Sequence, residues 1–85
     1  MNERKHLGVK FKVHGSRAVL NYNQTSPGSP YQKLMRQVMI VKDAGFERIT
    51  VIINTQDDGI YNLWRKEFVL IRRLFPMLDI VIVQQ

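Results

Sequence analysis

Two short segments, residues 48–55 (RITVIINT) and 79–83 (DIVIV), constrain the fold of this chain more than any other feature. Both are rich in β-branched residues and carry apolar side chains at successive positions, so both faces of each strand are apolar. Strands of this kind are covered on both faces or belong to a parallel sheet. Each one follows a segment with the period of an amphipathic helix. The sequence therefore predicts an α/β fold with two helix–strand units.

The two predicted helices span residues 30–44 and 59–75. Ser29 is the expected N-cap of the first helix and Gly45 its left-handed terminus, whereas Pro76 ends the second. At about 100° per residue, one side of each helix is apolar. The core side of the first carries Tyr31, Leu34, Met35, Val38, Met39 and Val41, and that of the second carries Ile60, Leu63, Trp64, Phe68, Leu70, Ile71, Leu74 and Phe75.

An N-terminal hairpin completes the predicted sheet. Leu7, Val9, Phe11 and Val13 alternate with Gly8 and basic residues, which is typical of a half-buried strand, and residues 17–22 form a second strand after a turn. Crossovers between parallel strands are right-handed. We therefore expect an α/β (α+β) two-layer sandwich of ββαβαβ order, with a mixed four-stranded sheet and two helices on one face. Residues 1–85 are expected to form a single domain.

Composition narrows the class of protein. With 85 residues, 45% of them apolar, the chain can bury one core, and a homodimer would supplement its modest buried surface. There are no cysteines, which excludes disulfides and cysteine-ligated zinc. The longest apolar runs are far shorter than a membrane span, and the polar N-terminus is unlike a signal peptide. We expect a cytoplasmic protein without a membrane partner.

One segment resembles a known family. Residues 30–39 (PYQKLMRQVM), Ala44-Gly45-Phe46 and Ile49-Thr50-Val51 are similar to the last helix and strand of ExbD/TolR-type periplasmic domains. The resemblance covers less than a third of the chain, and a further helix and strand follow where that family usually ends. It implies a helix packed on a sheet at this point, and we carry over no function from it.

Catalytic candidates are few. Asp57 and Asp58 follow a predicted parallel strand and precede a helix, where open α/β sheets place ligands. Two carboxylates there would suit Mg²⁺ in a nuclease. Helix capping explains the same residues without catalysis. His6 and His14 are too few for a metal site. We therefore expect a non-enzymatic protein that needs no cofactor, with the nuclease as a distant alternative.

Charge favours nucleic acid as the partner. Thirteen Lys and Arg residues against seven Asp and Glu give a net charge of +6. Lys10, Lys12 and Arg17 are expected on the open face of the hairpin, with Tyr22 able to stack on a base if it faces the same way. Our leading expectation is a small basic protein that binds nucleic acid through this sheet face and through a stripe on the second helix, namely Arg65, Lys66, Arg72 and Arg73.

The alternative is a protein-binding adaptor or inhibitor of the compact type carried by phages and mobile elements, with an acidic protein surface as its partner. Ile40 and Val69 are single apolar residues on the polar sides of the two helices, and together they form a candidate protein-contact patch. An apolar sheet face, either Ile52 with Val81 and Val83 or Ile52 with Ile80 and Ile82, or an edge strand would serve the same purpose.

Overall fold

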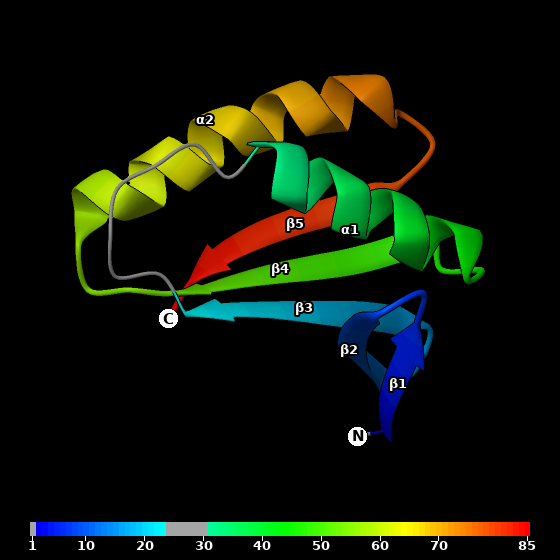
Figure 1. Ribbon diagram of the computed structural model, residues 1–85. Helices are drawn as coiled ribbons and strands as arrows, with labels where there is room; N and C mark the ends of the chain where they lie inside the picture. Colours follow the sequence, from blue (N-terminus) through cyan, green and yellow to red (C-terminus); the bar gives the residue numbers. More distant parts are fainter. Residues whose placement is uncertain (1, 24–30) are drawn as a thin grey trace.

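The computed structural model describes residues 2–23 and 31–85 (Figure 1). Within them the elements follow the order β1 (Asn2–His6), β2 (Val9–His14), β3 (Arg17–Asn23), α1 (Tyr31–Asp43), β4 (Arg48–Asn54), α2 (Asp58–Leu74) and β5 (Asp79–Gln84). The strands form one sheet of order β1-β2-β3-β4-β5. The first two neighbouring pairs are antiparallel, and the last two are parallel. The mixed sheet with two helices on one face is confirmed.

The prediction of four strands was wrong, because the described residues contain a fifth strand, β1. Its sequence, NERKH, has no apolar alternation, and four of its five residues are exposed. It is held by its pairing with β2, in a register that sets Asn2 opposite Val13 and His6 opposite Val9. An edge strand that buries almost nothing needs no apolar period, and this is why the sequence pattern missed it.

Leu7 also differs from expectation, since we assigned it to the inward face of a strand. His6 and Val9 are register partners, so Leu7 and Gly8 form the two-residue loop between β1 and β2. Both have positive φ, 49° for Leu7 and 81° for Gly8, as a type I′ hairpin turn requires. The Leu7 side chain is 68% exposed at the hairpin tip.

The hydrophobic core lies between the sheet and the two helices. Alternate strand residues face the helices, among them Phe11, Leu20, Val51 and Ile53. Trp64 of α2 is buried against Tyr22, with ring centroids 4.9 Å apart. β4 is a central strand, and the helices cover one of its faces. This explains its apolar sequence, as predicted.

The buried side of α1 is rotated from the predicted one, and that of α2 is narrower than predicted. Ile40, expected at the surface, is only 8% exposed, whereas Met39, expected in the core, is 45% exposed. The reason is that α1 contacts β2 as well as α2, and Figure 1 shows it lying between α2 and the curled hairpin. On α2, Leu70 and Leu74 are likewise exposed rather than buried.

The helix ends follow the sequence signals where they are described. Asp57 is the N-cap of α2, and Gly45 has a φ of 103° just after α1. The predicted Ser29 cap and Pro30 lie outside the described residues. Among the residues that are described, none of the helices is long and apolar enough to cross a membrane.

Candidate nucleic-acid interface

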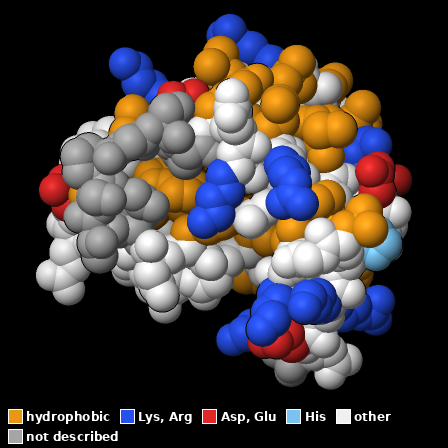
Figure 2. All heavy atoms as spheres, viewed as in Figure 1, with side chains coloured by type: hydrophobic (Ala, Val, Ile, Leu, Met, Phe, Trp, Pro, Cys, Tyr) orange, Lys and Arg blue, Asp and Glu red, His pale blue; other side chains and the backbone are white. Residues whose placement is uncertain are grey.

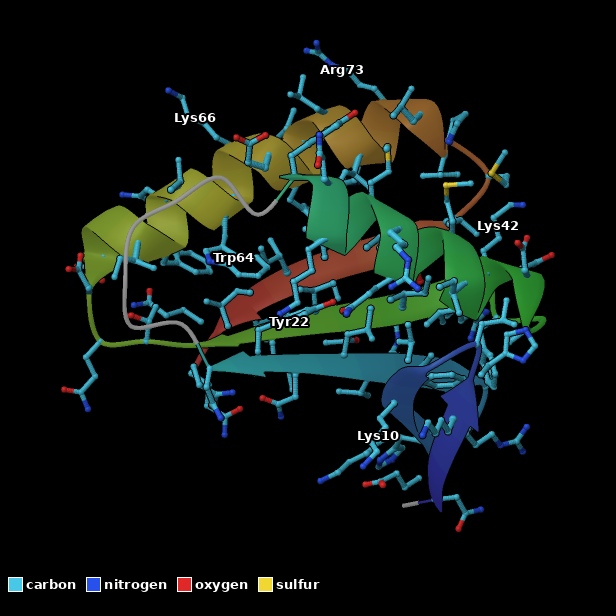
Figure 3. All side chains as sticks on the ribbon, in the orientation of Figure 1. Lys10, Tyr22, Lys42, Trp64, Lys66 and Arg73 are labelled. Carbon is cyan, nitrogen blue, oxygen red and sulfur yellow. The ribbon has the colours of Figure 1, made fainter. Side chains whose placement is uncertain are left out.

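The seven predicted phosphate-binding residues do not form one surface. Lys10 points away from the helices on the open side of the sheet, whereas Lys66 and Arg73 project from the opposite side of the molecule (Figure 3). We call Lys5, Lys10 and Lys12 the hairpin surface, and Arg65, Lys66, Arg72 and Arg73 the α2 surface. A straight nucleic-acid segment cannot contact both surfaces at once.

The hairpin surface is built by the register of β1 on β2. Lys5 is the direct partner of Lys10, and Glu3 is the direct partner of Lys12, so these four side chains share the open face. All four residues are exposed, and Figure 2 shows the hairpin carrying a group of cationic side chains below the body of the protein. Like charges directly opposite each other destabilise an antiparallel pair. The Lys5–Lys10 pair is therefore a position where a bound anion would relieve repulsion.

Leu7 lies at the tip of this hairpin and was missed as a functional candidate. A left-handed conformation costs an L-residue other than Gly roughly 1–2 kcal/mol. Strain of this kind is concentrated at functional sites. An exposed leucine that is strained and next to paired lysines has no role in the core, since its side chain contacts solvent. The sequence offered only Gly8 as a turn signal.

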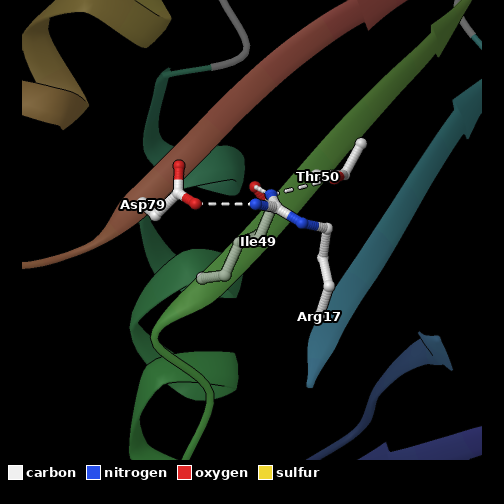
Figure 4. Close-up of polar contacts among 4 residues, drawn as sticks. All are labelled: Arg17, Ile49, Thr50 and Asp79. Carbon is white, nitrogen blue, oxygen red and sulfur yellow. Dashed lines mark hydrogen bonds and ion pairs between the residues drawn. The ribbon is translucent and has the colours of Figure 1, made fainter. Parts of the chain in front are cut away.

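Arg17 lies on the open face of the sheet, opposite His14, but its guanidinium group contacts other strands of the sheet. One guanidinium nitrogen, Nη1, donates to the Ile49 carbonyl and to Thr50 Oγ1, each at 3.2 Å. The other, Nη2, lies 2.7 Å from Asp79 Oδ2 (Figure 4). Arg17 thus reaches from β3 across β4 to β5, and its two terminal nitrogens make three hydrogen bonds within the sheet.

Tyr22 cannot stack on a base from the open face, because it faces the helices. It is buried against Trp64, its hydroxyl donates to Gln37 Oε1, and Lys33 Nζ lies 5.6 Å from the ring centroid. Burial raises the pKa of the Tyr22 hydroxyl well above its ordinary value. The phenol is therefore a structural group held in its neutral form.

The two candidate catalytic carboxylates have structural partners. Asp57 Oδ1 accepts from the backbone N–H groups of Gly59 at 2.8 Å and Ile60 at 3.2 Å. Asp58 Oδ1 accepts from Gln84 Nε2 at 3.0 Å. In the described part of the chain, no group of three or more His, Cys, Asp or Glu side chains is arranged to hold a metal ion. The contacts of Asp57 match the helix-capping interpretation, whereas Asp58 contacts a side chain of β5.

The predicted protein-contact patch is divided. Ile40 is buried, as described above, and so cannot touch a partner, whereas Val69 is 45% exposed among the cations of the α2 surface. Those four cations are exposed, and none of them is in an ion pair with another residue that the structure describes. On the sheet, Ile52, Val81 and Val83 share the open face, whereas Ile80 and Ile82 face the helices.

Comparison with known proteins identifies no relative of this chain. No family model, no curated protein and no solved structure matches the chain. The likeness of residues 30–51 to ExbD/TolR-type domains rests on those residues alone. The arguments that follow therefore depend on the side chains themselves.

Proposed function

We propose that this chain is a non-enzymatic protein that binds nucleic acid through the hairpin surface. The observation that carries the proposal is the Lys5–Lys10 pair, two exposed cations held opposite each other on a projecting hairpin. Lys12 continues the same face along β2. Phosphate groups would neutralise these charges, and release of counterions from the nucleic acid would drive binding.

The shape of the hairpin suits a groove. A two-stranded ribbon fits into the major groove of duplex DNA, and lysines contact phosphates without reading the sequence. Leu7 at the tip would then contact apolar edges of the bases, such as the thymine methyl group. The proposal predicts binding with weak sequence preference and strong dependence on salt.

The test is titration of a fluorescent DNA duplex, with single-stranded DNA and RNA in parallel, at several salt concentrations. We expect Lys10→Gln/Lys12→Gln to weaken binding roughly tenfold or more and to reduce the slope of log affinity against log salt by about two. The matched control is Lys66→Gln/Arg73→Gln, which removes the same charge from the α2 surface. We expect this control to retain most of the wild-type affinity.

Two results would contradict the proposal. One is an absence of binding by the wild-type protein even at low salt. The other is a larger loss in the Lys66→Gln/Arg73→Gln control than in the hairpin variant, which would move the contact to the α2 surface.

A further inference from the structure

We propose that the free edge of β5, together with the groove beneath α2, binds an extended acidic segment of a partner protein as an added strand. This site lies on other elements than the hairpin surface, and it takes a protein ligand rather than nucleic acid. It goes beyond the proposed function, and either proposal can fail without the other.

The backbone of β5 is open on one side. Within the described residues, β5 pairs with β4 alone. The N–H groups of Asp79 and Gln85 donate to the carbonyls of Glu47, at 2.8 Å, and Ile53, at 2.9 Å, and so they point inward. Because hydrogen-bonding direction alternates along a strand, Ile80 and Ile82 direct their N–H and C=O groups outward. Of these, the Ile82 carbonyl also accepts from the Tyr61 hydroxyl of α2 at 3.5 Å. These are the groups that an added strand would pair with.

A groove runs alongside this edge. One hollow of about 270 Å³ is lined by Arg65, Phe68, Val69 and Arg72 of α2 and by residues 80–82 of β5. A second, of about 320 Å³, continues past the end of α2 and is lined by Val69, Arg72, Arg73, Pro76 and Leu78. The two hollows share Val69 and Arg72. The groove therefore has an apolar floor and a cationic wall.

The edge lacks the usual protection against strand addition. In natural proteins, lysine, proline or an inward-pointing charge on an edge strand prevents its pairing with another chain. The β5 sequence, DIVIVQ, contains neither lysine nor proline, and its one charge, on Asp79, is paired with Arg17. An apolar strand edge in this state is suited to binding by strand addition, in which main-chain hydrogen bonds give affinity and side-chain pockets give specificity.

The charge of the groove indicates which kind of segment would bind there. Arg65, Arg72 and Arg73 line the groove, and each lacks an ion-pair partner in the part of the chain that the structure describes. A second copy of the chain paired through β5 would set one group of arginines against the other, which is repulsive. Carboxylates instead form strong, often bidentate hydrogen bonds with arginine. The occupant is therefore a partner segment in which acidic residues alternate with apolar ones.

The test uses a peptide of alternating glutamate and valine as the probe and one of alternating lysine and valine as its control. Amide hydrogen exchange, resolved by NMR, reports the site directly. We expect the glutamate peptide to slow exchange at Ile80 and Ile82, which have no ladder partner, and to change Asp79 and Val81 little. We expect Arg65→Glu/Arg72→Glu to lose about tenfold or more in affinity for this peptide and to gain affinity for the lysine peptide.

The matched control is Arg36→Glu/Lys66→Glu, which changes the net charge equally at exposed helix positions away from the groove. It should bind the glutamate peptide almost as well as the wild type. Three results would overturn the proposal: unchanged exchange at Ile80 and Ile82, equal binding of the two peptides, or protection of these amides that rises with protein concentration in the absence of peptide. The last result would identify a second copy as the occupant. None of the variants touches the hairpin lysines.

Discussion

At the scale of single residues, Leu7 at the hairpin tip and Arg17 in the sheet have environments that are set by the way the strands pair. Leu7 was expected in the core and instead occupies a left-handed turn at the hairpin tip. Arg17, which was predicted to bind phosphate, joins three strands of the sheet through its guanidinium group. In both cases the residue type fits two environments, and only the tertiary neighbours decide between them.

Leu7→Asn separates stability from function. Asn tolerates positive φ and, followed by Gly8, forms the preferred type I′ dipeptide, so we expect the free energy of unfolding to rise by about 1 kcal/mol. If Leu7 contacts the bases, the same substitution should weaken nucleic-acid binding severalfold. Urea unfolding and the duplex titration measure the two effects. A variant that is less stable than the wild type would show that the turn conformation carries no strain.

The raised pKa of the Tyr22 hydroxyl predicts how the free energy of unfolding changes at high pH. Its pKa in the folded protein is raised by burial, whereas in the unfolded chain it is near the ordinary value of about 10. Above that pH the unfolded state loses the proton and the folded state keeps it. The stabilisation from neutral Tyr22 is thus fully present below pH about 10 and is lost as the pH rises further.

The control for this effect is Tyr22→Phe, which removes the hydroxyl and its hydrogen bond to Gln37. We expect it to be about 1 kcal/mol less stable than the wild type near neutral pH. Its stability should then decline less steeply than that of the wild type above pH about 10. Urea unfolding across this range measures both, and equal slopes for the two proteins would count against a raised pKa.

At the scale of elements, the helices could be predicted from local sequence patterns, whereas the edge strand β1 could not. The helices were predicted within one or two residues of their observed ends, because periodicity and caps are local properties. β1 had no such signal, since an exposed edge strand is defined by its partner's backbone. The rotation of the buried side of α1 is likewise a property of its neighbours, because α1 packs against both α2 and β2.

The N-cap of α2 provides a test at this scale. Asp57 accepts two backbone hydrogen bonds, whereas Asp58 lies in the first turn and contacts the exposed Gln84 side chain. We expect Asp57→Ala to reduce the free energy of unfolding by about 1 kcal/mol, and Asp58→Ala by only a few tenths. Chemical denaturation of both variants measures the difference. Equal losses would mean that Asp57 does not act as a cap.

At the scale of the whole molecule, the topology separates the charged surfaces. Both helices cover one face of the sheet, so Lys10 is displayed on the other face, whereas Lys66 and Arg73 project from the helical side (Figures 1 and 3). Cationic side chains are thus divided between two separate surfaces, for which we propose different ligands. One surface is a projecting ribbon, and the other is the wall of a groove beside an open strand edge.

The sequence alone determined the order of the helices and of the four apolar-patterned strands, and the parallel character of β4 and β5, because these depend on spacing between nearby residues. The tertiary structure decided the register of β1 on β2, which places Lys5 opposite Lys10. It also decided the partners of Arg17 and the burial of Ile40. The physical reason is that the exposure and charge environment of a side chain are set by segments distant in sequence. Local periodicity carries no information about those segments.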